Sequence, residues 1–267
     1  MAVITAGAVH SLALQTDGTM WGWGRNASGE LGDGTTIDRW TPVQVSELTA
    51  VVAIAAGYNH SLALKADGTV WACGYNQSGQ LGDGTTFNRI TPVQVLGVTD
   101  VVAIAAGDSH SLALKTDGTV WAWGYNGSGA LGDGTQIDRS TPVEVLNLTG
   151  IVAIAGGGVH SLAAKTDGTV WAWGYNGYGQ LGDGTQIDRS MPVQVPNLTN
   201  VAAVVGGYVH SLAVKTDGTV WAWGYNSYGE LGDGTRNWRS TPVQVLNLTG
   251  TTAITAGGHH SLFLAEP

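Results

Sequence analysis

Six histidines recur every fifty residues, and a serine directly follows each one: His10, His60, His110, His160, His210 and His260. Imidazoles can ligate a metal ion, and a histidine beside a serine suggests the base and nucleophile of a hydrolase. Equivalent side chains of successive repeats lie a whole repeat apart, however, whereas a metal needs its ligands within about 2 Å of one point. Neighbours on an extended chain also point to opposite faces. The pattern therefore predicts structural histidines, each fixing its hairpin through a backbone hydrogen bond, and no metal site.

A second column places an aspartate in Leu-Gly-Asp-Gly-Thr, six residues before an arginine. This carboxylate can accept hydrogen bonds from the amides of its glycine-rich loop and from the guanidinium. A calcium loop is the alternative, since Asn26, Asp33 and Asp38 offer oxygen ligands, but position 38 becomes Asn88 and Trp238 elsewhere and EF-hand spacing is lacking. The pattern favours structural roles for Asp33, Asp83, Asp133, Asp183, Asp233, Arg39, Arg89, Arg139, Arg189 and Arg239.

Catalysis requires different groups that converge on one reacting atom, whereas this chain offers columns of like groups. The serine beside each histidine has no third partner that would make a triad. The glycine motifs lack the lysine and the following helix of a phosphate-binding loop. The sequence predicts that the protein is not an enzyme and needs no cofactor.

A fifty-residue repeat positions these columns. The 267 residues align with themselves without insertions as 1–50, 51–100, 101–150, 151–200, 201–250 and a partial 251–267, which we interpret as one domain. The chain contains 41 glycines and only 12% charged residues, a composition that disfavours helices.

Each repeat predicts four short strands, called A to D. In the third repeat, strand A is 101–107, strand B is 110–115, strand C is 120–124 and strand D is 142–145. Asp117-Gly118 predicts a primed two-residue turn between strands B and C. Proline at the start of strand D suits an outer strand, which can forgo one hydrogen bond to a neighbouring strand.

A four-stranded unit of this size cannot cover both its faces, so neighbouring units must stack face to face around an axis. The predicted fold is all-β, a β-propeller with five full blades and half of a sixth. The strand C tryptophans of one blade, such as Trp121 and Trp123, are expected to meet small residues of the next blade. Cys73 replaces one such tryptophan, which predicts slacker packing around a buried, unreactive thiol.

The segment from Gly107 to Thr135 carries the motif Gly-x-x-His-Ser-Leu-Ala-Leu-Lys-x-Asp-Gly-Thr-Val-Trp-Ala-Trp-Gly-x-Asn-x-x-Gly-x-Leu-Gly-Asp-Gly-Thr. This motif resembles the repeat of the regulator of chromosome condensation (RCC1) family, and the resemblance covers the whole chain. The family implies a β-propeller that is usually seven-bladed, whereas this chain supplies five blades and two further strands. Two arrangements stay open: a six-position ring with an unfinished blade, or five closed blades with a surplus pair. An unpaired strand edge predicts a homo-oligomer.

Charge narrows the classes of partner. Eleven basic and twenty acidic residues give a net charge of −9, which repels nucleic acid and anionic membrane surfaces. The chain has no apolar run long enough to span a membrane and no secretory signal, so a soluble protein of unknown compartment is expected.

Two regions differ between repeats, the A–B turn and the C–D loop, and a meander brings both to one face of the propeller. These regions hold aromatic side chains, which anchor many protein interfaces. The residues predicted to form a partner-binding face are Tyr58, Asn59, Asp108, Tyr208, His259, Trp40, Phe87, Ile90, Tyr178, Tyr228 and Trp238.

The sequence thus favours a non-enzymatic scaffold that binds a protein partner. A glycan-binding lectin, an exchange factor implied by the family, and an engineered or repeat-amplified propeller without a natural partner are the alternatives. The family implies that exchange activity uses an inserted wedge, which these repeats lack. For family members that sense ultraviolet light, the resemblance implies a tryptophan directly before the repeat histidine. At these positions this chain instead has Val9, Asn59, Ser109, Val159, Val209 and His259.

Overall fold

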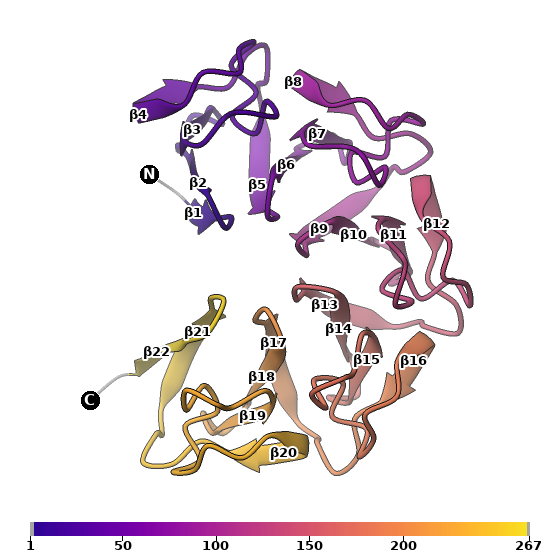
Figure 1. Cartoon of the computed structure of the whole chain (residues 1–267), viewed down its shortest axis with the longest axis vertical. Coiled ribbons are helices and arrows are strands. Elements are labelled where there is room, and N and C mark those ends of the chain that lie inside the picture. The colour runs from indigo at the N-terminus through magenta and orange to yellow at the C-terminus, as the bar shows by residue number, and fades with distance from the viewer. Residues whose placement is uncertain (1–2, 266–267) are drawn as a thin grey trace. The chain divides into compact units, whose positions relative to one another are not determined.

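All regular secondary structure in the computed structural model, which describes residues 3–265, is β-strand. The strands form five four-stranded antiparallel sheets and one two-stranded sheet, and consecutive strands pair in each (Figure 1). This confirms the predicted all-β class built from fifty-residue, four-stranded units with a partial sixth. Nothing in the described range is a helix of the length and apolarity that crossing a membrane would require.

Strands A and B begin every sheet and lie close to their predicted bounds. The A strands are β1 (Val3–Ala6), β5 (Val51–Ala56), β9 (Val101–Ala106), β13 (Ile151–Gly156), β17 (Val201–Gly206) and β21 (Thr251–Ala256). The B strands are β2 (His10–Leu14), β6 (His60–Lys65), β10 (His110–Lys115), β14 (His160–Lys165), β18 (His210–Lys215) and β22 (Ser261–Ala265).

Strands C and D complete the first five sheets. The C strands are β3 (Met20–Gly24), β7 (Val70–Gly74), β11 (Val120–Gly124), β15 (Val170–Gly174) and β19 (Val220–Gly224). The D strands are β4 (Arg39–Gln44), β8 (Arg89–Gln94), β12 (Arg139–Glu144), β16 (Arg189–Gln194) and β20 (Arg239–Gln244).

Strand D begins three residues earlier than the sequence predicted. Arg139 pairs with Gly124, and the register then shifts before Val143 pairs with Ala122. The strand therefore starts at the arginine of the Asp–Arg column, and its proline lies inside the strand beside a bulge, where a missing backbone donor is tolerated. Trp40 and Ile90, expected on C–D loops, are consequently the second residues of β4 and β8.

The predicted primed turn between strands B and C was also wrong. Gly18 has φ of +79°, but Asp17 does not adopt a positive φ. The Gly18 amide donates to the Gln15 carbonyl at 3.1 Å, and the Gln15 amide donates to the Thr19 carbonyl at 2.9 Å. These bonds define a three-residue loop, a type I turn closed by a left-handed glycine, which explains why only the glycine of Asp-Gly needs positive φ.

The chain groups into two compact units. Unit 1 comprises residues 1–126 and 137–144, and unit 2 comprises residues 127–136 and 145–267. Residues 127–136, the C–D loop of the third repeat, belong to unit 2 because the next sheet binds them. The Ala130 carbonyl accepts from Ser161 Oγ at 2.9 Å and from Trp173 Nε1 at 2.8 Å.

Each unit has a core between successive sheets. In unit 1, fully buried Trp123 packs with Ala72 and Leu81 of the preceding repeat, and in unit 2 Trp223 packs with Ala172 and Leu181. Both arrangements confirm the predicted contact of a strand C tryptophan with small residues of the neighbouring sheet.

Cys73 occupies the matching tryptophan position in the second sheet and is buried. Its Sγ lies 3.6 Å from the Glu30 carbonyl, the place that an indole N–H takes in later sheets. Met20, Leu48 and Pro92 lie around Cys73, and no space large enough for a water molecule is left among them. The thiol is therefore buried as predicted, but the predicted slack packing is not seen; burial raises the pKa of the thiol to about 12, which agrees with an unreactive cysteine.

Candidate functional site

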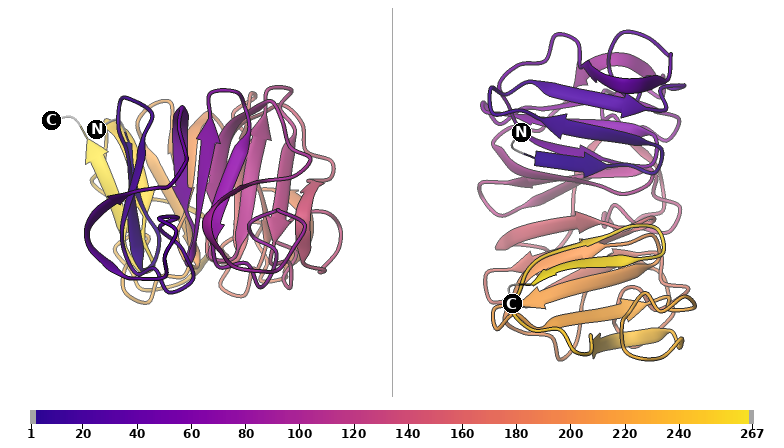
Figure 2. Two further views of the ribbon diagram at one scale, coloured as in Figure 1. Left: turned by 90° about the horizontal axis from the view of Figure 1, so that it is seen from above. Right: turned by 90° about the vertical axis from the view of Figure 1, so that its left-hand side faces the viewer.

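The connections of each sheet leave at two opposite ends (Figure 2). The Tyr75 amide, which opens a C–D loop, donates to the Asn59 carbonyl of the A–B turn at 2.8 Å. The Val51 amide, which follows the D–A connection, donates to the Gly18 carbonyl of the B–C turn at 3.1 Å. We call the end that carries the A–B turn and the C–D loop the variable end of a sheet.

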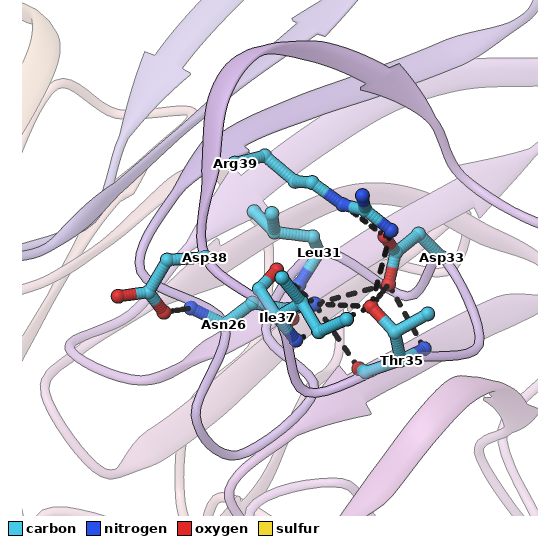
Figure 3. Close-up of polar contacts among 7 residues, drawn as sticks. All are labelled: Asn26, Leu31, Asp33, Thr35, Ile37, Asp38 and Arg39. Carbon is cyan, nitrogen blue, oxygen red and sulfur yellow. Dashed lines mark hydrogen bonds and ion pairs between the residues drawn. The ribbon is translucent and has the colours of Figure 1, made fainter.

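The C–D loop of the first repeat is closed by its own polar side chains (Figure 3). Buried Asn26 donates through Nδ2 to Asp33 Oδ1 and to the Thr35 carbonyl, both at 3.0 Å. Its backbone amide donates to Asp38 Oδ1 at 2.8 Å, and Arg39 donates through Nε to Asp33 Oδ2 at 2.7 Å. These hydrogen bonds connect the beginning of the loop to its end.

The same aspartate–arginine bond recurs in other repeats. The Nε–Oδ2 distances are 2.7 Å for Arg89–Asp83, 2.9 Å for Arg189–Asp183 and 2.8 Å for Arg239–Asp233. Burial alone would raise the pKa of Asp33, but hydrogen bonds from Thr35 and Arg39 outweigh it and hold that pKa below its ordinary value. Among the residues that the structure describes, no three histidine, cysteine or carboxylate side chains are placed to share a metal ion.

Within the described residues, the rings of His10, His60 and His210 do not bond to the backbone of their own hairpins, so the prediction from the sequence was wrong for them. The histidine Nε2 atoms instead meet a serine of the next repeat: His10–Ser61 at 2.9 Å, His60–Ser111 at 3.0 Å, His160–Ser211 at 2.9 Å and His210–Ser261 at 3.1 Å. His260 is exposed. The prediction failed because the partner lies in another repeat, 51 residues along the chain.

The serine fixes the protonation of the imidazole. Ser61 Oγ donates its hydrogen to the Glu30 carbonyl at 2.6 Å, so it must accept from His10 Nε2–H. The His10 Nδ1 atom therefore carries no proton, and it has no hydrogen-bond partner within the described residues. The ring of His60 also packs so closely on Gly57 that a Cβ at position 57 would overlap it. These histidines are uncharged, and their hydrogen bonds connect one sheet to the next.

Aromatic side chains gather at the variable end in unit 2. Tyr178 makes edge-to-face contacts with Tyr225 and Trp238, with ring centroids 5.1 and 4.8 Å apart. The His259 ring lies 5.6 Å from Tyr228, 5.9 Å from Tyr225 and 6.2 Å from Tyr208. We call this set, with Tyr175, the aromatic cluster: Tyr175, Tyr178, Tyr208, Tyr225, Tyr228, Trp238 and His259.

The cluster is ordered yet accessible. Tyr228 is 73% exposed and Trp238 is 45% exposed, although Trp238 Nε1 donates to Ser227 Oγ at 3.0 Å. Five residues predicted from sequence for a partner-binding face therefore come together here: Tyr178, Tyr208, Tyr228, Trp238 and His259.

The remaining predicted face residues lie in unit 1 and do not form this cluster. Tyr58 and Phe87 are exposed, on an A–B turn and a C–D loop. Asn59 and Asp108 are half-buried on A–B turns, and burial raises the pKa of Asp108 to about 6. Trp40 and Ile90 are exposed on the outermost strands β4 and β8, so their predicted placement on loops was wrong.

Sequence reasoning missed three residues of the site. Tyr175 and Tyr225 belong to a column that holds tyrosine in four of the five full repeats and Arg25 in the first, so the recurrence of tyrosine suggested a structural role. Glu230 lies under the cluster, with His259 Nδ1 at 3.6 Å from its Oε1. The available signal was that this position varies between repeats, reading Glu30, Gln80, Ala130 and Gln180 before Glu230.

The chain was compared with known proteins. The family model for the RCC1-like domain matches residues 1–263. Human WBSCR16 superposes with a TM-score of 0.86 at 26% identity, over 99% of this chain and 71% of that protein. Yeast RCC1 (Prp20), solved in complex with Kap60, superposes with a TM-score of 0.85 at 26% identity, over 98% of this chain and 67% of that protein.

One curated protein matches a short segment. The ultraviolet-B receptor UVR8 of Arabidopsis thaliana is 45% identical over 42 residues, which is 16% of this chain and 10% of the receptor. The chain thus spans about a tenth of the length of that curated relative in the match.

Proposed function

The chain belongs to the family of RCC1-like domains, and from that premise we propose that it is a non-enzymatic scaffold that binds a protein partner through the variable end of its sheets. Folds of this family serve mainly in protein binding or nucleotide exchange, and the structural neighbour yeast RCC1 was solved bound to Kap60. The observation that carries the proposal is the partly exposed aromatic cluster of unit 2.

Pre-organisation favours the cluster as an anchor. Tyrosine and tryptophan bury a large area with few rotatable bonds, and they dominate the energetics of many interfaces. Tyr178, Tyr225 and Trp238 already contact one another, and Trp238 Nε1 is bonded to Ser227. Their ordering costs little further entropy on binding, which leaves more of the contact energy for affinity.

The columns of histidine and aspartate support a scaffold rather than a catalyst. The histidine Nε2 atoms are engaged with serines of the next repeat, and the aspartates are engaged by arginines of their own loops. Tyr58, Asn59, Phe87 and Asp108 at the variable end of unit 1 are proposed to contribute further contacts.

The test compares a truncation inside the aromatic cluster with one outside it. A random peptide library displayed on phage is selected on the protein, and the affinities of selected peptides are measured for Trp238→Ala and Leu246→Ala. Leu246 is 54% exposed on the D–A connection and is not part of the aromatic cluster, so it is an apolar control of similar exposure. We expect Trp238→Ala to weaken binding about 30-fold, which corresponds to about 2 kcal/mol, and Leu246→Ala to leave it unchanged.

Equal affinities for the two variants would overturn the proposed face. Specific retention on a glycan array in place of peptide binding would favour a lectin. Accelerated nucleotide release from a panel of small GTPases would favour an exchange factor.

A second proposal concerns self-association through β22. Within residues 3–265, the last sheet consists of β21 and β22 alone, and Leu262 and Leu264 are 57% and 64% exposed. The strand carries neither a charge nor a proline, the residues that usually protect a sheet edge. Light scattering should show a dimer or larger oligomer that Leu264→Lys dissociates, and a monomeric parent protein would contradict the proposal.

A further inference from the structure

We propose that the partner presents an arginine side chain to the aromatic cluster, with the buried carboxylate of Glu230 as its counter-ion. The inference rests on the proposed function and specifies the chemistry that the site recognises.

Glu230 is a buried acid with half of its hydrogen-bonding capacity unused. Its side chain is 0% exposed, and Oε2 accepts the Tyr228 amide at 2.9 Å. Its other oxygen, Oε1, has no hydrogen-bond partner within the described residues. His259 Nδ1 stands 3.6 Å away, too far for a hydrogen bond. A buried carboxylate oxygen without a donor is costly, so a donor from a partner would relieve a real deficit.

The fold does not need a carboxylate at this position. Gln180 accepts the Tyr178 amide at 3.0 Å, and Gln80 accepts the Ser78 amide at 3.0 Å, the same bond that Glu230 makes with Tyr228. The third repeat has Ala130 there, and the first has Glu30, whose buried Oε1 likewise has no hydrogen-bond partner within the described residues. Glutamine thus satisfies the backbone equally well without a buried charge. Glu230 differs from Glu30 in its neighbours, because the His259 ring of the aromatic cluster lies 3.6 Å from its Oε1, and we assign it a role beyond the C–D loop on that ground.

The surroundings of Glu230 suit a guanidinium group. The rings of Tyr225, Tyr228 and His259 lie within 5.6 to 6.3 Å of one another over this acid. Guanidinium is weakly hydrated, stacks on aromatic rings and donates several hydrogen bonds in one plane. The chain already uses such contacts at the other end of the sheets, where Lys215 Nζ lies 4.6 Å from the Trp221 ring centroid.

Charge also favours a cationic partner. The chain carries a net charge of −9, which attracts basic segments over long range. Two arginines lie close by in sequence: Arg239, at the start of β20, is paired with Asp233 at 2.7 Å, whereas Arg236 of the C–D loop is exposed and is the one cation of this loop that a basic partner must avoid. His259 is 53% exposed and covers Oε1. In the complex the guanidinium replaces the imidazole as the group that faces Oε1, and the ring of His259 turns aside.

The test is a double-mutant cycle on peptides selected from the displayed library. Each selected peptide is synthesised with arginine and with citrulline, its neutral isostere, and both are titrated against the parent protein and Glu230→Gln. Glu30→Gln is the matched control, because Glu30 holds the equivalent position in unit 1 and its substitution changes the net charge by the same amount. Thermal melting checks that both variants fold like the parent protein.

We expect the library to enrich arginine, and citrulline to weaken binding at least tenfold to the parent protein and to Glu30→Gln. Binding to Glu230→Gln should be weak and insensitive to citrulline. Selected peptides that need Trp238 but lack arginine, or that lose equal affinity in both variants, would overturn this inference and leave the proposed function intact. Peptides that bind independently of Trp238 would overturn the proposed function itself.

Discussion

The buried histidines predict that the protein unfolds in mild acid. Burial lowers the pKa of His10, His110 and His210 to about 4, and burial together with its histidine neighbours lowers that of His60 to about 3, from 6.5. Between pH 6.5 and about 4, these histidines are therefore protonated in the unfolded chain but not in the folded chain. Stability is fully present above pH 6.5 and is lost as the pH falls through this window.

The magnitude follows from the pKa values. At pH 5 each of these four histidines costs about 2 kcal/mol of folding free energy relative to pH 7.5. Asp108 acts in the opposite direction, because its pKa is raised to about 6, and it offsets about 1 kcal/mol of this loss at pH 5. The net loss of about 7 kcal/mol rivals the stability of a typical domain, about 5–15 kcal/mol. The aspartates with lowered pKa values, such as Asp33, contribute only at lower pH.

The assay is urea unfolding, followed by tryptophan fluorescence and circular dichroism, at pH 7.5 and at pH 5. His60→Gln keeps an amide donor near the Nε2 position but does not titrate, so its loss between the two pH values should be about 2 kcal/mol smaller. His260→Gln, at an exposed position of the same column, should match the parent protein. Equal stability at both pH values, or an undiminished loss in His60→Gln, would refute the reasoning.

Three further predictions concern stability, each measured by urea unfolding at pH 7.5. Ser111→Ala should lower the free energy of unfolding by about 1–3 kcal/mol, because His60 Nε2–H loses its acceptor and the Gln80 carbonyl loses one donor. An unchanged urea midpoint would contradict a stabilising role of the His60–Ser111 hydrogen bond. Trp173→Cys, which copies the second repeat, should cost about 3–5 kcal/mol through a cavity and a lost bond to the Ala130 carbonyl. Ala50→Gly should stabilise by about 0.5–1 kcal/mol, since Ala50 has φ of +58° where Gly150 and Gly250 stand in other repeats; a loss of stability would refute the strain.

Local patterns predicted most of the fold. The apolar runs ended by glycine, and the Asp-Gly turns, located strands A, B and C nearly to the residue. Strand D was predicted too short because the prediction placed its start at the proline. The strand in fact begins at Arg139, which pairs with Gly124 of strand C, and this pairing has no signature in the local sequence. The left-handed Gly18 was foreseeable, but the type of its turn depends on the φ of Asp17.

The site was predictable only in part. Differences between repeats pointed to Tyr178, Tyr228 and Trp238, because variable columns mark positions that the scaffold leaves open. The same logic missed Tyr225, because four of the five full repeats have tyrosine in its column, although its ring contacts Tyr178 and Tyr228 of the cluster. The His10–Ser61 tie joins residues 51 apart in sequence, so no local pattern could reveal it.

Hydrogen exchange of the protein bound to a selected peptide tests the central claim most directly. The account predicts protection confined to the variable end of unit 2, in segments 175–178, 206–209, 225–239 and 257–259. Protection of the B–C turns at 165–169 and 215–219 instead would contradict it.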